Sequence, residues 1–183
     1  MLRCPPRIIL LESAHMTFVC RAVPRVTAAA VIVTGLLCAL DTRDPAPPFK
    51  AKTLDGEKFD NTSLKGRVVL LQFWATWCRY CRGDQSAVDA VNRDYAGQGL
   101  LVLAVNVGES KKKVKQYLAD SPRDCKIVLT EDPNLAAMFA AKAFPLYVLI
   151  DRQGNIVGTQ RGAGGEDMLR RLLRKAGLTE PQG

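Results

Sequence analysis

Two cysteines separated by two residues, Cys78 and Cys81, directly follow an apolar run over residues 68–74. A continuous run of this kind is typical of a strand buried on both faces. A helix that begins at Cys78 would place its thiol at the helix N-terminus, where unpaired backbone N–H groups and the helix dipole stabilise a thiolate. Cys81 would lie one turn further, within reach to form a disulfide. The pattern therefore predicts a site in which Cys78 is the nucleophile and Cys81 resolves the mixed disulfide.

The rest of the chain alternates predicted strands with predicted helices. Buried strands are expected over residues 100–107 and 146–150, and a turn at Asp151 to Asn155 would return the chain as an antiparallel neighbour. Further upstream, Asp55-Gly56 separates two short alternating stretches, as the turn of a hairpin does. A βαβ unit followed by an antiparallel hairpin and a terminal helix is the thioredoxin-type plan. We therefore predict an α/β, thioredoxin-like fold with a central mixed sheet flanked by helices and an N-terminal β-hairpin extension.

Residues 16–40 have the composition of an export signal. Arg21 and Arg25 supply its positive end, and an uncharged, largely apolar run extends over residues 26–40. This run is short for a membrane span, which usually needs about 20 apolar residues. A cleaved signal peptide and a retained anchor are therefore both open. Either form predicts a location in the periplasm or at the outer face of the cytoplasmic membrane.

Composition divides the chain into four segments. We expect translation to start at Met16, because the residues before it resemble neither a signal nor a fold element. Lipidation of Cys38 would require a small residue where Leu37 stands. The expected segments are a non-native leader at residues 1–15, a signal peptide or membrane anchor at 16–40, a Pro-rich spacer at 41–48 and the thioredoxin-like domain at 49–183.

Composition also argues against two other classes of protein. With 48% hydrophobic residues, the chain is too apolar for general disorder. The formal charge is +8, of which residues 41–183 carry +5. The densest basic cluster, at residues 111–115, lacks the interleaved aromatic residues of a nucleic-acid site. We therefore expect a solvated helix face there, and no nucleic-acid partner.

The cysteine pair could also belong to a metal site or to a purely structural bridge. Zinc normally needs four Cys or His ligands, whereas residues 41–183 contain Cys125 as the one further cysteine and no histidine. The missing histidine also argues against a copper chaperone of the same fold. We therefore predict no metal and no cofactor, while a structural disulfide stays open. Cys125, beside a short predicted strand, is expected to be a small buried apolar residue.

Three segments together resemble the TlpA/ResA-like group of thioredoxin-fold thiol-disulfide oxidoreductases. They are residues 104–110, residues 149–157 and the stretch Phe73-Trp74-Ala75-Thr76-Trp77-Cys78-Arg79-Tyr80-Cys81. The likeness runs in the same order over residues 49–178. It implies a periplasm-facing domain, often membrane-tethered, that commonly reduces protein disulfides. Cytochrome c maturation and metal-site assembly are the implied settings, so apocytochrome c or metal-site assembly proteins and a membrane redox donor are the expected partners.

The resemblance also implies roles for residues around the cysteine pair. Phe144 and Pro145 match the loop that faces the pair, where the family has a cis-proline. Pro145 would shape the substrate groove and keep metal ions off the thiols, and Phe144 and Trp77 would add apolar walls. Asp84 matches the position of a family glutamate, so its carboxylate would take a proton from Cys81. The alternative for Asp84 is a first-turn carboxylate that the helix dipole stabilises.

The residues between the cysteines depart from the family pattern. Tyr80 stands where the family often has proline, and so does Ser86 further along the helix. Arg79 should favour the Cys78 thiolate and thereby make the couple more oxidising, whereas a charged Asp84 would act in the opposite direction. For a two-electron couple, about 30 mV corresponds to only ~1.4 kcal/mol, so a single charge contact changes the reduction potential noticeably. Arg79 and Tyr80 are therefore expected to tune the reduction potential of the cysteine pair. The direction of exchange stays open.

The predicted function is that of an exported thiol-disulfide oxidoreductase that reduces protein disulfides through Cys78 and Cys81. Two alternatives remain: a disulfide oxidase or isomerase, and a non-catalytic, chaperone-like module that binds through the groove at Phe144 and Pro145. A peroxidase is disfavoured, because the Pro-x-x-x-Thr-x-x-Cys arrangement of peroxiredoxins is absent from the domain.

Overall fold

The computed structural model describes residues 44–130 and 134–181 of the chain. The strands of this part are β1 (Asp44–Pro45), β2 (Lys50–Thr53), β3 (Lys58–Asp60), β4 (Val68–Trp74), β5 (Leu100–Asn106), β6 (Lys126–Leu129), β7 (Leu146–Ile150) and β8 (Asn155–Arg161). The helices are α1 (Arg79–Gly83), α2 (Gln85–Asp94), the 3-10 turn η1 (Ala96–Gln98), α3 (Lys111–Asp120), α4 (Asn134–Met138) and α5 (Gly165–Arg174).

The described strands form one mixed sheet in the order β1-β8-β7-β4-β5-β6-β2-β3. β4 pairs in parallel with β5, and β5 with β6, whereas β7 runs antiparallel to both β4 and β8. The predicted central mixed sheet is thus confirmed. The parallel pairs require crossovers, which α1, α2 and α3 supply, while a short turn suffices between the antiparallel strands β7 and β8.

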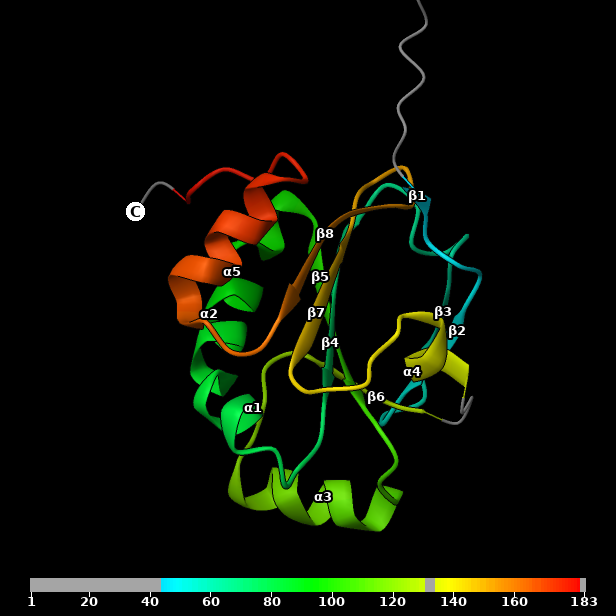
Figure 1. Ribbon diagram of the computed structural model, residues 1–183, viewed down its shortest axis with the longest axis vertical. Helices are drawn as coiled ribbons and strands as arrows, with labels where there is room; N and C mark the ends of the chain where they lie inside the picture. Colours follow the sequence, from blue (N-terminus) through cyan, green and yellow to red (C-terminus); the bar gives the residue numbers. More distant parts are fainter. Residues whose placement is uncertain (1–43, 131–133, 182–183) are drawn as a thin grey trace, which may run out of the picture. The chain divides into compact units, whose positions relative to one another are not determined.

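Separate hydrophobic cores cover the two faces of the sheet. Successive side chains of β4 point to opposite faces, so Leu70 packs in the core that contains α2 and α5, and Leu71 in the other. Figure 1 shows α2 and α5 together on one side of the strands and α4 on the other side. Every residue of β4, β5 and β7 is buried, because these strands lie inside the sheet and are covered on both faces.

The N-terminal strands add a hairpin to the sheet, as predicted. β2 and β3 pair antiparallel, with Lys50 opposite Asp60, and β2 also pairs with β6. The connecting turn uses Gly56 at a φ of 99°, a conformation that glycine adopts without a steric penalty. The Gly56 N–H donates to the Thr53 carbonyl at 3.0 Å.

The sheet begins before the expected domain boundary at residue 49. Asp44 and Pro45 pair antiparallel with β8, and the Ala46 N–H donates to the Gly154 carbonyl at 2.9 Å. Part of the expected spacer therefore belongs to the sheet, at an edge where proline is tolerated. The expected leader and the expected signal or anchor lie outside the described residues. Within the described part of the chain, no helix is long and apolar enough to cross a membrane.

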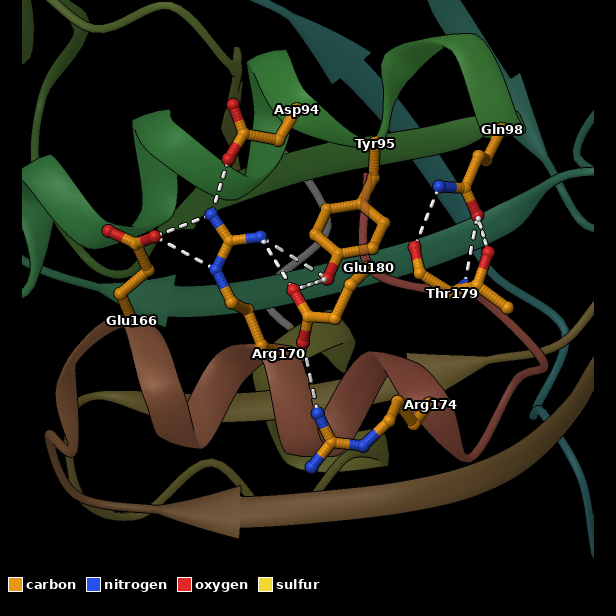
Figure 2. A network of polar contacts seen from close by, with 8 residues as sticks. All are labelled: Asp94, Tyr95, Gln98, Glu166, Arg170, Arg174, Thr179 and Glu180. Atoms are coloured by element: carbon orange, nitrogen blue, oxygen red, sulfur yellow. Dashed lines mark hydrogen bonds and ion pairs between the residues drawn. The ribbon is translucent and has the colours of Figure 1, made fainter. Parts of the chain in front are cut away.

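A cluster of charged side chains attaches the C-terminal segment to α2 and α5 (Figure 2). Arg170 of α5 binds Asp94, Glu166 and Glu180, and its guanidinium lies 5.5 Å from the centre of the Tyr95 ring. The buried Tyr95 ring therefore has both an apolar environment and polar partners for its hydroxyl, at the C-terminal end of α2.

Candidate functional site

Cys78 lies at the N-terminus of α1, directly after the loop that leaves β4. It is the N-cap residue in extended conformation, and its sulfur accepts a hydrogen bond of 3.1 Å from the Cys81 N–H. The two sulfurs form a disulfide, and their Cα atoms are 5.2 Å apart. The helix N-terminus thus directs an N–H group at the sulfur of Cys78, which is the arrangement that stabilises a thiolate after reduction.

Two exposed aromatic side chains are neighbours in sequence of this buried disulfide. Cys78 and Cys81 are only 4% and 2% exposed, whereas Trp77 and Tyr80 are 63% and 69% exposed. The Trp77 ring lies 6.0 Å from the ring of the half-buried Phe144. Large apolar surfaces that remain in contact with water beside a reactive group are typical of a binding site.

Phe144 and Pro145 precede β7 and are joined by a cis peptide bond, as the resemblance implied. Pro145 is buried, and its carbonyl accepts a hydrogen bond of 2.8 Å from the Gly162 N–H. The contact between Phe144 and Trp77 brings this segment, distant in sequence, against the residue that precedes Cys78. That Pro145 shapes a substrate groove stays a prediction.

Asp84 connects α1 and α2 and is 5% exposed. Its Oδ2 accepts hydrogen bonds from the Tyr147 hydroxyl at 2.8 Å and from the Gly164 N–H at 3.1 Å, and its Oδ1 accepts one from the Gly165 N–H at 3.0 Å. The carboxylate is thus held by β7 and by the start of α5. A role as proton acceptor for Cys81 stays a prediction.

Glu109 also contributes to the site, although its sequence position alone assigned it no role. It lies in the segment 104–110 that carries the resemblance, and this membership is the one signal that could have singled it out. Its carboxylate accepts hydrogen bonds of 2.6 Å from both the backbone N–H and the hydroxyl of Thr76, in the loop before Cys78. Asn106 and Lys113 contact the same carboxylate at 2.8 and 2.7 Å.

The environment of Glu109 keeps its carboxylate charged. Burial by itself would raise the pKa of Glu109, but the hydrogen bonds from Asn106, Lys113 and Thr76 outweigh burial and lower it to about 2. Glu109 follows β5, and its partner Lys113 lies in the first turn of α3. The contacts of Glu109 with Thr76 therefore anchor the loop that carries Trp77 and Cys78 to the end of β5 and the start of α3.

Basic side chains lie on the exposed side of α1. Arg79 and Arg82 are both exposed, and the guanidinium of Arg82 donates a hydrogen bond of 3.0 Å to the Thr76 carbonyl. Water screens the charge of an exposed arginine, which limits its effect on a nearby thiolate. The tuning roles expected for Arg79 and Tyr80 stay predictions.

Cys125 is separate from this site in both position and chemistry. It is buried next to β6, and desolvation raises the pKa of its thiol to about 12. A protonated, inaccessible thiol is a poor nucleophile. In the described part of the chain, no three His, Cys, Asp or Glu side chains lie together as metal ligands would.

Known proteins share both the sequence pattern and the fold. The redoxin family model matches residues 41–173. The thiol-disulfide oxidoreductase ResA of Bacillus subtilis is 30% identical over 68% of this chain and 69% of its own length. The thioredoxin-like protein YneN of the same organism is 36% identical over 61% of this chain. The chain spans just under two thirds of the length of YneN, or 66%.

A solved structure has the same arrangement of elements. A thiol:disulfide interchange protein from Chlorobium tepidum superposes with a TM-score of 0.65 at 28% identity, over 73% of this chain and 96% of that one. The thioredoxin-like fold predicted from sequence is thereby confirmed. The chain belongs to the redoxin family, within its ResA-like group of thiol-disulfide oxidoreductases.

Proposed function

We propose that this protein reduces disulfide bonds in exported proteins. The observation that supports the proposal best is the Cys78–Cys81 disulfide at the N-terminus of α1, beside the exposed rings of Trp77 and Tyr80. The rings offer apolar contact to a polypeptide, and the helix N-terminus favours the attacking thiolate.

The exchange has two steps. The Cys78 thiolate attacks a client disulfide, forms a mixed disulfide with one client sulfur and releases the other as a thiolate. Cys81 then loses its proton and attacks Cys78, which forms the Cys78–Cys81 disulfide and releases the second client thiol. The client gains two electrons, and a membrane redox donor returns the protein to the dithiol form. Asp84 is the proposed acceptor of the Cys81 proton.

The proposed location is the periplasm or the outer face of the cytoplasmic membrane. Residues 16–40 support it through their basic start and their uncharged, largely apolar run. Apocytochrome c and metal-site assembly proteins are the proposed clients, because they expose cysteine pairs that must be reduced before a metal or haem is attached. A fusion of residues 16–48 to a reporter enzyme that is active only outside the cytoplasm tests the location, and an inactive fusion would refute it.

Two measurements test the direction of exchange. The reduced protein should reduce insulin, and its equilibrium with glutathione should give a potential clearly more reducing than that of strong oxidants, which lies near −120 mV. A potential close to that value, with efficient oxidation of reduced substrates, would replace the proposal by an oxidase or isomerase.

Cysteine variants identify the roles of the two sulfurs. Cys81→Ser should accumulate a mixed disulfide with the client at Cys78, whereas the matched variant Cys78→Ser should accumulate none. If Cys78→Ser retained full function, a non-catalytic, chaperone-like role would account for the protein instead.

A further inference from the structure

A continuous set of buried polar side chains leads from Asp84 to Arg123, in the segment before β6. Gln72 of β4 and Tyr147 of β7 are opposite each other in the sheet, and both are fully buried. Cross-strand partners of this kind project from the same face of a sheet. The Gln72 Nε2 donates to the Tyr147 hydroxyl at 3.4 Å, and that hydroxyl donates to Asp84 at 2.8 Å.

Arg123 occupies the other end of this set. Its side chain is 1% exposed, and its Nε donates to both carboxylate oxygens of Asp89, at 3.1 and 3.2 Å. Its Nη2 donates to the Gln72 Oε1 at 3.2 Å, and its guanidinium lies 5.8 Å from the centre of the Trp74 ring. A buried guanidinium with these partners has little freedom to move.

Arg123 fixes the orientation of the Gln72 amide, and the acceptor-only carboxylate of Asp84 fixes the direction of the bond from Tyr147. A guanidinium can only donate, so the Gln72 oxygen must face Arg123 and its NH₂ group must face Tyr147. The Tyr147 oxygen then accepts from Gln72, and its proton is directed to Asp84. The Tyr147 hydroxyl therefore donates to the Asp84 carboxylate and accepts from Gln72, and the orientation of Gln72 depends on Arg123, which lies 51 residues from Gln72 in sequence.

The receiving carboxylate lies close to the resolving cysteine. Asp84 follows Cys81 by three residues and has helical backbone angles, so the two side chains lie on neighbouring positions of one helical face. Both are buried, and Tyr147 and Cys81 belong to the same core. Besides Tyr147, the two backbone N–H groups at Gly164 and Gly165 contact Asp84.

We propose that Tyr147 is a positioning residue, which Gln72 and Arg123 orient so that its hydroxyl holds the Asp84 carboxylate in place to accept the Cys81 proton. The inference rests on the proposed exchange chemistry and concerns its second step: the bond between Cys78 and the client sulfur breaks, the Cys78–Cys81 bond forms, and the Cys81 proton moves to Asp84. Besides Cys78 and Arg123, the titratable or charged groups on the elements around Asp84 are Arg79, Tyr80, Cys81 and Arg82 on α1, Asp89, Arg93 and Asp94 on α2, Tyr147 on β7, and Glu166, Asp167, Arg170, Arg171 and Arg174 on α5.

The second step can be observed separately with an aromatic disulfide whose released thiolate absorbs visible light. The reduced full chain, with Cys4, Cys20 and Cys38 replaced by serine in every protein compared, should release one thiolate when Cys78 attacks and a second when Cys81 resolves. Stopped-flow traces over a range of pH give a profile for each step. Cys81→Ser should abolish the second release and so assign it.

In Tyr147→Phe, the acid limb of the second-step profile should move to higher pH, with a rate on that limb about tenfold lower than in the parent. The reason is that the charged carboxylate has lost a donor. The first step should keep its profile. In an Asp84→Asn background, Tyr147→Phe should cause no further shift, because a residue that acts through Asp84 has no effect without it.

Tyr95→Phe is the matched control. Tyr95 is also fully buried, and its hydroxyl also has charged partners, Arg170 and Glu180, but at the C-terminal end of α2 (Figure 2). This variant should lose stability and leave the second-step profile unchanged. An equal shift in Tyr95→Phe, an unchanged profile in Tyr147→Phe, or a shift that persists without Asp84 would overturn the inference.

Two further results keep the inference separate from the proposed function. If Tyr147→Phe does not fold, Gln72→Met removes the other contact of the Tyr147 hydroxyl and should shift the profile in the same direction; an unchanged profile would then overturn the inference. If the parent protein shows no second release at all, the proposed exchange chemistry fails, and the positioning role fails with it. If the parent protein shows the second release but Tyr147→Phe does not shift its pH profile, only the positioning role is refuted.

Discussion

The carboxylate of Glu109 accepts two hydrogen bonds from Thr76, one from its N–H and one from its hydroxyl, both at 2.6 Å. Thr76 precedes Cys78 by two residues, whereas Glu109 follows β5. The side chain of Glu109 is only 4% exposed, so water does not compete effectively for these contacts. The position of the loop before the disulfide therefore depends on a residue that takes no part in the exchange chemistry.

Glu109→Gln should lower the free energy of unfolding by about 2 kcal/mol. The amide keeps the size of the side chain, but it loses the charge that Lys113 and Thr76 contact, and its NH₂ group faces other donors. Urea unfolding at neutral pH measures the change. Lys113→Ala is the matched control and should cost less, because the side chain of Lys113 is 55% exposed. Equal losses in the two variants would contradict this account.

Stability should fall in acid because of Glu109. The pKa of Glu109 is lowered from 4.5 to about 2, so the unfolded chain takes up the proton more readily than the folded one. The resulting contribution, ~3 kcal/mol, is fully present above about pH 5 and is lost as the pH falls toward 2. Urea unfolding from about pH 6 to pH 3 tests this. Glu109→Gln should show a smaller decline, and parallel declines would refute the assignment.

Two arginine–aspartate pairs join α2 to the segment before β6, and they should differ strongly in their effect on stability. Arg123 and Asp89 are 1% and 11% exposed, whereas Arg93 and Asp124 are 59% and 53% exposed. Asp89→Ala should cost about 3–5 kcal/mol, because it leaves a buried guanidinium without its counter-charge. Asp124→Ala should cost under ~1 kcal/mol. Chemical unfolding of both variants measures the contrast, which a similar loss in each would contradict.

The exposed rings of Trp77 and Tyr80 should matter for protein clients and not for small disulfides. Replacing both with alanine removes apolar contact surface but leaves the disulfide at the start of α1 in place. We expect kcat/KM for a protein disulfide to fall about tenfold, or ~1.4 kcal/mol. The rate with a small-molecule disulfide in the same variant is the control and should stay within about twofold. A proportional fall with both substrates would mean that the rings affect the cysteines themselves.

Cys125 should be unreactive in the folded protein. Because burial raises the pKa of its thiol to about 12, only about one molecule in 10⁴ carries the thiolate at pH 8. Treatment of the reduced, native protein with iodoacetamide, followed by peptide mass spectrometry, should show modification at Cys78 and none at Cys125. Denaturation should make Cys125 reactive. Rapid native modification of Cys125 would contradict the burial of this thiol.

Much of the fold follows from local sequence patterns. The apolar runs at β4, β5 and β7 predict strands that are buried on both faces, and Asp55-Gly56 predicts the β2–β3 turn, because both signals depend on neighbouring residues. The cap of α3 is likewise local: the Ser110 hydroxyl accepts a hydrogen bond from the Lys113 N–H three residues further on. The pairing of residues 44–45 with β8 was not predicted, because it depends on a partner more than 100 residues away.

The sequence by itself determined the cysteine pair and its place between a buried strand and a helix, because spacing and hydrophobic periodicity are local properties of the chain. Only the tertiary structure decided what surrounds that pair. Thr76 and Glu109 are 33 residues apart, and Asp84 and Tyr147 are 63 apart. Such contacts require a specific strand register and hydrogen-bond geometry. A carboxylate in a sequence does not reveal which donors the folded chain will place around it.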